Sequence, residues 1–210
     1  VDLGSTTTKA ILIDEEGQIV GKGITNSRSN YEVASAVARD EAVTSARFNL
    51  LARQLEAERG PGSDEIRALD KMLLAAFRLE LYLDELTALR ARVGEVVAIG
   101  TRAGAPVKEA LTAIFDRMER DAPAQFLGGE ESKSDFFRDI AGSRFMAIAE
   151  PIGRESALGY DVLLNVYDRA IIDVENRPPA DDISDKFLRA LDHALAGGAF
   201  TGAPAAVVTR

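Results

Sequence analysis

The chain opens with Val1-Asp2-Leu3-Gly4-Ser5-Thr6-Thr7-Thr8-Lys9-Ala10-Ile11-Leu12-Ile13-Asp14, in which two short apolar runs flank a group of small hydroxyl residues. A turn of glycine, serine and threonine brings several backbone N–H groups and hydroxyls to one point, which is the arrangement that binds a phosphate chain. The helix-opening pattern G-x-x-x-x-G-K-[ST] is absent here, and the β-branched residues after Lys9 favour a strand. We therefore predict a nucleotide phosphate loop at the tip of a β-hairpin.

The first residues of the loop suggest a metal ligand and a phosphate cradle. Asp2, at the end of the first strand, suits Mg²⁺ held through water, because this hard cation keeps several waters and needs only one carboxylate beside phosphate oxygens. Gly4 would let the backbone approach the phosphates, while Ser5 and Thr6 would donate N–H and O–H bonds to them. The alternatives are an Asp that only caps the turn and a plain Gly-Ser turn.

The last residues of the loop are less specific. Thr7 and Thr8 point to opposite sides of an extended strand, so at most one of them reaches the phosphates. Lys9 either compensates phosphate charge or is an ordinary exposed strand lysine. The predicted nucleotide-binding set is therefore Gly4, Ser5, Thr6, Thr7 and Lys9, with Asp2 as the catalytic and metal-binding carboxylate.

The segment from Asp2 to Lys9 resembles the first phosphate motif of the actin, Hsp70 and sugar-kinase superfamily, D-x-G-[ST]-[ST]. Its extension to Thr-Lys is similar to the ATPases that energise electrons for benzoyl-CoA reductase and 2-hydroxyacyl-CoA dehydratases. The later stretch Gly21-Lys22-Gly23-Ile24-Thr25-Asn26-Ser27-Arg28-Ser29-Asn30-Tyr31 resembles the ATP-binding subunits of the reductase in particular. The resemblance covers about the first thirty residues.

The resemblance implies a fold and a function. The fold is an α/β, ribonuclease H-like nucleotide domain that is interrupted by a large, mainly helical insertion. The function is ATP binding and hydrolysis, with Mg²⁺, that drives low-potential electron transfer to acyl-CoA-reducing subunits in anaerobic aromatic degradation. The implied partners are a paralogous ATPase subunit and those catalytic subunits. Asn26, Arg28 and Asn30 match the reductase-like stretch, and Arg28 could face the nucleotide, a partner or solvent.

The cysteine count bears on this family assignment. The related ATPases share one [4Fe-4S] cluster at a subunit interface, held by cysteines in the second half of the subunit. This chain has no cysteine, so it supplies no thiolate ligand. We expect the chain to be a fragment whose adenine pocket and water-activating residue lie elsewhere, and which does not hydrolyse ATP alone.

The composition is that of an ordinary globular chain. The 210 residues are 46% hydrophobic, and 25 Lys and Arg against 34 Asp and Glu give a net charge of −9. Nucleic acids and anionic membranes select clustered positive charge, so we expect neither as a partner. No apolar run approaches the length of a membrane span. These features predict a cytoplasmic location.

The first half of the chain is predicted to form a small sheet followed by long helices. A third strand is expected over residues 18–25, where Gly21 and Gly23 mark a bulge or a close backbone approach. Ser29 and Glu32 form a capping box that opens a helix, and Gly60-Pro61-Gly62 ends it. Ser63 caps a second long helix with Gly94 as a plausible stop, so the two helices form an antiparallel hairpin.

The second half is expected to be helical with one loop region. Residues 95–101 fit a strand or a continued helix, and Pro106 suits the first residue of the next helix. Residues 121–134 are predicted to form a loop, and residues 135–148 and 156–174 to form helices. A last helix is predicted to begin at Asp182 or Ser184 and to end at Gly197-Gly198. Residues 205–209 look like a strand. The predicted organisation is ATPase sheet at 1–29, helical insertion at 30–200 and a returning strand at 201–210.

Two other function classes compete with the ATPase. One is a small-molecule kinase of the same superfamily, although no sugar-binding motif is evident, and the other is a non-enzymatic helical docking module. His193 is the single histidine and is expected on a helix surface rather than in a metal site or triad. The acidic pairs Glu130-Glu131 and Asp181-Asp182 are expected to be solvated. Three apolar pairs are expected in a core or subunit contact: Phe126-Leu127, Phe136-Phe137 and Phe145-Met146.

Overall fold

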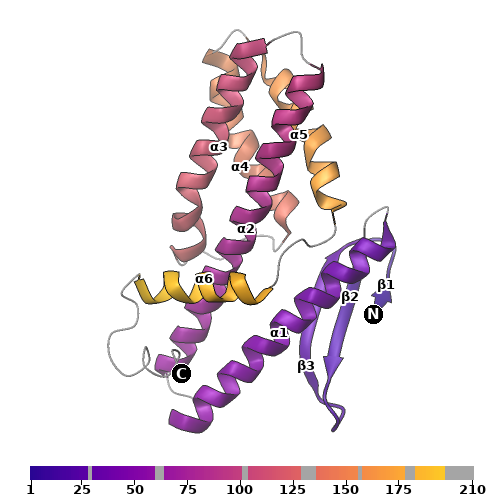
Figure 1. Ribbon diagram of the computed structural model, residues 1–210, viewed down its shortest axis with the longest axis vertical. Helices are drawn as coiled ribbons and strands as arrows, with labels where there is room; N and C mark the ends of the chain where they lie inside the picture. Colours follow the sequence, from indigo (N-terminus) through magenta and orange to yellow (C-terminus); the bar gives the residue numbers. More distant parts are fainter. Residues whose placement is uncertain are drawn as a thin grey trace. The chain divides into compact units, whose positions relative to one another are not determined.

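The computed structural model describes residues 1–27, 30–59, 64–100, 104–128, 136–155, 158–177 and 183–196. Within these residues the chain is mainly helical and carries one small antiparallel sheet (Figure 1), so the α/β expectation holds in this coarse form. The elements are β1 (Asp2–Leu3), β2 (Thr7–Ile13), β3 (Ile19–Asn26), α1 (Tyr31–Arg59), α2 (Asp64–Gly100), α3 (Gly104–Leu127), α4 (Phe137–Glu155), α5 (Tyr160–Glu175) and α6 (Ile183–Ala196).

The chain divides into two compact units. The first unit contains Val1–Glu80 and α6, and therefore the sheet, α1 and the start of α2. The second unit, Leu81–Arg177, contains the rest of α2 with α3, α4 and α5. None of the described helices combines the length and the apolar character needed to cross a membrane.

The sheet is the predicted meander, with strand order β1-β2-β3. Asp2 pairs with Lys9, and Thr8 pairs with Thr25. Leu12 pairs with Gly21, but the next residue, Ile13, pairs with Ile19. The register therefore shifts here, and Val20 is an extra residue on β3. The third strand and the bulge beside Gly21 are thus confirmed, and the N-terminal motif lies on a β-hairpin.

Helix α1 covers one face of the sheet at very short range (Figure 1). A Cβ atom at Gly21 would lie 2.2 Å from the Ala42 carbonyl oxygen, and one at Gly23 would lie 2.0 Å from that of Ala38. Both glycines therefore mark a close backbone approach. The facing stripe of α1 repeats at helical spacing and is made of buried alanines: Ala34, Ala38, Ala42 and Ala46.

Side chains of α1 also close the outer edge of β3. The Glu41 carboxylate accepts a hydrogen bond from the Ile24 N–H at 2.9 Å, and the Asn49 amide donates one to the Val20 carbonyl at 2.8 Å. Two of the backbone groups that this edge strand leaves unpaired are thereby satisfied from within the chain.

The start of α1 differs from the expected capping box. The Asn30 side-chain oxygen accepts hydrogen bonds from the N–H groups of Glu32, at 3.0 Å, and Val33, at 3.2 Å. Asn30 is therefore the N-cap, one residue after the predicted Ser29, which lies outside the described residues. Both residue types suit this position, so local preference alone did not separate them.

An aromatic cluster joins the helices of the first unit. Phe48 of α1 meets Phe77 of α2 and Phe187 of α6 edge to face, with ring centroids 5.4 and 5.6 Å apart. Beside it, the buried Glu80 carboxylate accepts a hydrogen bond from the Arg189 guanidinium at 2.9 Å. These contacts join α1, the first-unit part of α2 and α6, while the antiparallel hairpin expected of the two long helices stays a prediction.

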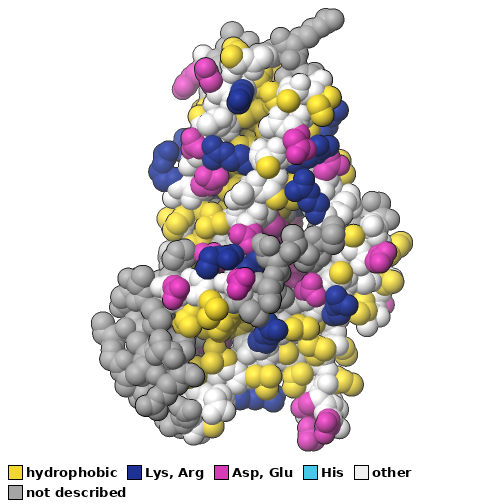
Figure 2. All heavy atoms as spheres, viewed as in Figure 1, with side chains coloured by type: hydrophobic (Ala, Val, Ile, Leu, Met, Phe, Trp, Pro, Cys, Tyr) yellow, Lys and Arg dark blue, Asp and Glu magenta, His cyan; other side chains and the backbone are white. Residues whose placement is uncertain are grey.

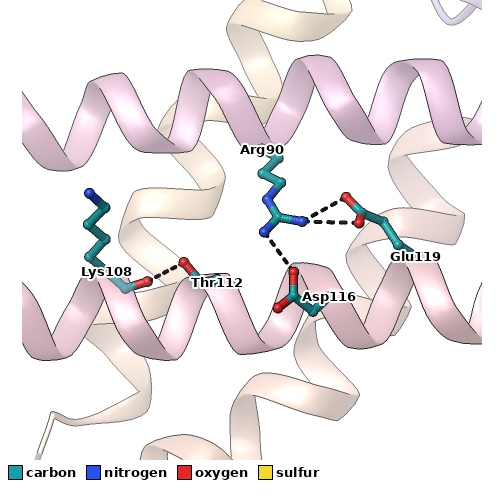
Figure 3. Close-up of polar contacts among 5 residues, drawn as sticks. All are labelled: Arg90, Lys108, Thr112, Asp116 and Glu119. Carbon is teal, nitrogen blue, oxygen red and sulfur yellow. Dashed lines mark hydrogen bonds and ion pairs between the residues drawn. The ribbon is translucent and has the colours of Figure 1, made fainter.

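The second unit has a large-residue core. Phe115 of α3, Phe145 of α4 and Tyr167 of α5 form a continuous ring contact, with Phe145 and Tyr167 stacked at 4.4 Å. On its surface Arg90 of α2 binds Glu119 and Asp116 of α3 (Figure 3). In the view of Figure 2, Lys and Arg side chains are interspersed with Asp and Glu, without a large region of one sign.

Helix α2 extends beyond Gly94, the residue that was predicted as its end. Gly94 does not end it, because the helix continues to Gly100 and buries Val93 and Val96 on either side of the glycine. The strand alternative for residues 95–101 is wrong for residues 95–100, which are helical. Burial of the periodic valines outweighs the cost of about 1 kcal/mol for a glycine inside a helix.

Helix α3 likewise extends into the region predicted as a loop. Residues 121–127 are helical despite Pro123, while Ala122 is fully buried and the Phe126 ring lies 5.1 Å from that of Tyr82. Pro106 is the third residue of α3 rather than its first. Tertiary packing thus overrides the helix-breaking tendency of proline. The predicted helices 135–148 and 156–174 correspond to α4 and α5, although α4 extends to Glu155.

Candidate functional site

The loop between β1 and β2 is a tight turn that depends on Gly4. The Gly4 N–H donates a hydrogen bond to the Thr7 carbonyl at 3.1 Å. A Cβ atom at position 4 would lie 2.7 Å from the same carbonyl oxygen. Glycine is therefore required for the turn itself, and its N–H is used inside the loop rather than being left for a ligand.

Ser27, which follows β3, holds the loop from the side. Its N–H donates to the Thr6 carbonyl at 2.8 Å, and its hydroxyl donates to the Gly4 carbonyl at 2.5 Å. The Ser27 hydroxyl also lies 3.1 Å from that of Thr8. Sequence reasoning missed this residue, because its side-chain contacts join positions 19 and 23 residues apart. The only available signal was a hydroxyl residue directly after the third strand.

The tip of the loop presents unused donors. Ser5 and Thr6 are exposed, and neither N–H is donated to any described residue. The carbonyls of Gly4 and Thr6 are occupied by Ser27, so the orientation of the peptide groups around the tip is fixed. Two N–H groups and two hydroxyls held in a preformed turn can bind the oxygens of an anion.

Thr7 and Thr8 lie on opposite faces of the sheet. Thr8 is fully buried against α1 and bonded to Ser27, so its role is structural. Thr7 lies on the opposite face together with Lys9, as the two-residue period of a strand requires. Of the two threonines, Thr7 is therefore the one whose side chain lies on the exposed side.

Asp2 and Lys9 lie next to each other on that exposed face. They are register partners on β1 and β2, both are exposed, and no ion pair with a described residue is recorded for either. Directly opposite side chains on neighbouring strands have Cβ atoms about 5 Å apart. The Asp2 carboxylate and the Lys9 ammonium group therefore lie next to each other, one residue pair beyond the Leu3–Thr8 pair.

The rest of this face carries several apolar side chains that no described residue covers. Ile11, Ile13 and Ile24 are exposed by 56%, 60% and 43%. Lys22, opposite Ile11, is the other cation of the face. A sheet with one face packed by a helix and the other still carrying several isoleucines has the pattern of a layer that another layer covers.

The site offers a single carboxylate to a metal ion, that of Asp2. Among the described residues, no group of three or more His, Cys, Asp or Glu side chains could hold a metal ion. Asp2 therefore suits Mg²⁺ only as part of a shell completed by water and phosphate oxygens. The donor set fits a magnesium nucleotide, whereas a chain without cysteine supplies no thiolate for an iron–sulfur cluster.

The remaining candidates fall outside this site. Asn26 pairs with Thr7 at the start of β2, while Asn30 is used as the cap of α1. Phe145 is in the core, whereas the neighbouring Met146 is 43% exposed. Several predicted residues lie outside the described residues or side chains: Arg28, Glu130, Glu131, Asp181, Asp182, His193, Gly197, Gly198 and the strand at 205–209.

Comparison with known proteins adds no relative. No family model, no curated protein and no solved structure matches this chain.

Proposed function

We propose that this chain carries the phosphate loop of an ATP-binding subunit that drives low-potential electron transfer to an acyl-CoA-reducing partner, as in benzoyl-CoA reductase. The observation that supports nucleotide binding is the β1–β2 turn, where Ser5 and Thr6 present unused donors beside Asp2 and Lys9. The electron-transfer part rests on the sequence resemblance described above.

In this proposal the residues act by binding and orientation. The N–H groups and hydroxyls of Ser5 and Thr6 donate to phosphate oxygens, and the Lys9 ammonium offsets their charge. Asp2 would hold a magnesium ion through its waters, and such an ion would supply positive charge next to the phosphates. Ser27 keeps the turn in the conformation that presents these donors. The sheet face with Ile11 and Ile13 would pack against the remainder of a ribonuclease H-like domain.

Coupling to electron transfer needs a second state of the assembly. ATP shifts an equilibrium between two subunit arrangements only if it binds one of them better. The [4Fe-4S] cluster would be held by cysteines outside this chain, between paralogous subunits. We expect this chain alone to bind nucleotide without hydrolysing it.

Calorimetric titration of the full 210-residue chain with Mg-ATP and Mg-ADP tests the loop. Asp2→Asn and Lys9→Ala should each weaken binding about tenfold, which corresponds to about 1.4 kcal/mol. Lys22→Ala is the matched control, because Lys22 is also exposed on the uncovered sheet face but lies farther from the turn. Equal losses from Lys9→Ala and Lys22→Ala, or no binding by the unaltered chain, would contradict the phosphate-loop assignment.

A second experiment separates the ATPase from its competitors. The anaerobically purified complex of this protein with its co-purifying subunits should show a [4Fe-4S] electron paramagnetic resonance signal that changes when Mg-ATP is added. Transfer of phosphate to a small alcohol or acid would favour the kinase. A complex that assembles through the helices with no nucleotide bound would favour the docking module.

A further inference from the structure

A chain of hydrogen bonds runs beneath the turn between β1 and β2. The Thr8 hydroxyl, on a fully buried side chain, lies 3.1 Å from the Ser27 hydroxyl. The Ser27 hydroxyl donates its proton to the Gly4 carbonyl. Because a hydroxyl has only one proton to donate, Ser27 must accept the hydrogen bond that joins it to Thr8. The chain therefore has one direction, from Thr8 through Ser27 to the Gly4 carbonyl.

The Gly4 carbonyl belongs to the same peptide group as the Ser5 N–H. This peptide group is trans, so its carbonyl and its N–H point in opposite directions. Ser27 and the buried Thr8 hold the carbonyl on the inner side of the turn. The Ser5 N–H is therefore directed away from them, toward the exposed tip, where it is donated to no described residue.

The same chain makes the Ser5 N–H a stronger donor. Hydrogen bonds in series polarise one another, and they do so most strongly where water is excluded. A hydroxyl that accepts a hydrogen bond becomes a better donor, and a carbonyl that accepts one draws electron density from the N–H of its own peptide group. Thr8 and Ser27 therefore increase the partial positive charge that the Ser5 N–H presents to an anion.

We propose that Ser27 is a positioning residue of the phosphate loop, which aims and polarises the Ser5 N–H toward a phosphate oxygen, and that Thr8 acts through it. This inference rests on the proposed function, because it requires that the loop binds phosphate. Neither hydroxyl meets the ligand, since Thr8 is fully buried and the proton of Ser27 is used on Gly4. The competing explanation is a purely structural role, in which the two hydroxyls only satisfy each other.

Calorimetric titration of the full chain with Mg-ATP, well below the thermal midpoint of each variant, separates these roles. Ser27→Ala removes the donor to the Gly4 carbonyl but keeps the N–H that holds the Thr6 carbonyl, so binding should weaken about tenfold. Ser27→Thr keeps a hydroxyl and should bind nearly as tightly as the unaltered chain.

Thr25→Val is the matched control for the loss of a hydroxyl. Thr25 is buried and is the register partner of Thr8, but no hydrogen bond of its hydroxyl to the described loop residues is recorded. Its substitution should therefore leave the affinity for Mg-ATP unchanged. An equal loss from Thr25→Val and Ser27→Ala would contradict a specific role for Ser27.

A double-mutant cycle tests whether Thr8 acts through Ser27. Thr8→Val alone should weaken binding about twofold, since it removes only the polarising bond. In the Ser27→Ala background the same substitution should leave the affinity unchanged. It should also raise the thermal midpoint there, because it removes a buried hydroxyl that has lost its partner. Additive losses of affinity would contradict the chain.

The Ser5 amide proton provides a measurement that does not depend on the stability of the fold. In the ligand-free chain its NMR chemical shift should move upfield in Ser27→Ala, and less in Thr8→Val, because the N–H loses polarisation. An unchanged chemical shift, or an unchanged affinity for Mg-ATP, in Ser27→Ala would overturn the positioning role alone. Failure of the unaltered chain to bind Mg-ATP would instead contradict the proposed function, and this inference with it.

Discussion

The two units of this chain are packed by opposite means. In the first unit α1 lies on the sheet through alanines and glycines, so close that Gly21 and Gly23 have no room for a methyl group. In the second unit the helices are held apart by large rings, among them Phe115 and Phe145. The sheet unit should therefore be sensitive to added atoms, and the helical unit to removed atoms.

The largest effect is expected from removing a ring of the helical unit. Phe145→Ala leaves a cavity between Phe115 and Tyr167 and should lower the free energy of unfolding by about 3–5 kcal/mol. Met146→Ala, at the exposed neighbouring position, should cost less than about 1 kcal/mol. Urea unfolding gives both values, and hydrogen exchange should place the loss in α3, α4 and α5. Similar costs for the two variants would mean that the ring core is not the stabilising element.

The next effect is expected from adding one methyl group to the sheet unit. Gly23→Ala places its Cβ against the Ala38 carbonyl and should destabilise by about 1–3 kcal/mol, with faster exchange in β2, β3 and α1. Gly94→Ala is the matched control, because no atom lies within 4 Å of its added Cβ. This variant should instead stabilise by about 0.5–1 kcal/mol. The same sign for both substitutions would refute the close approach of α1.

A third effect, at alkaline pH, should come from the helical unit. Burial raises the pKa of Tyr82 to about 12 and that of Tyr167 further, against about 10 in the unfolded chain. The stabilising contribution of the neutral phenols is complete below pH 10. Above it the unfolded state releases protons that the folded state keeps, so the free energy of unfolding falls by up to about 1.4 kcal/mol per pH unit for each tyrosine.

Urea unfolding of the unaltered chain and of Tyr82→Phe from pH 9 to about 12 measures this slope. The variant should lose stability less steeply across the window between the unfolded and folded pKa values of Tyr82. Parallel curves would show that Tyr82 is not shielded from water.

The smallest effect is expected at the surface of the helical unit. Arg90 donates to both Glu119 oxygens at 3.0 Å and to Asp116 at 2.6 Å (Figure 3). These side chains are more than a third exposed, so Arg90→Gln should cost only about 0.2–1 kcal/mol, and less in 1 M salt. Arg120→Gln serves as the control, since Arg120 is exposed and has no recorded ion pair with a described residue. A larger, salt-independent loss would show that the pair contributes to the core packing.

The sheet could be predicted from the sequence because its signals are local. Glycine and hydroxyl residues set the turn at Gly4, and β-branched residues recur along β2, namely Thr7, Thr8, Ile11 and Ile13. The same chemistry predicted Ser5 and Thr6 as phosphate donors, and both residues are exposed. Ser27 could not be identified in this way, because its hydrogen bonds depend on how β3 returns to the loop.

The helical unit was harder to predict because long-range burial decides where its helices end. Pro123 and Gly94 are ordinary breakers by local preference, yet Ala122, Phe126 and Val96 gain buried contacts only if the helices continue. The sequence also could not separate Ser29 from Asn30 as the cap, since both types serve equally well.

The side chains of Glu41 and Asn49 on the outer edge of β3 have a consequence for association between chains. An exposed edge strand is a template for strands of other molecules, and this is how many sheet proteins aggregate. Here an incoming strand would first have to displace the hydrogen bonds to Ile24 and Val20. The helix that packs the sheet thus also protects it against sheet-to-sheet polymerisation at this edge, a safeguard most useful while newly made chains are crowded together.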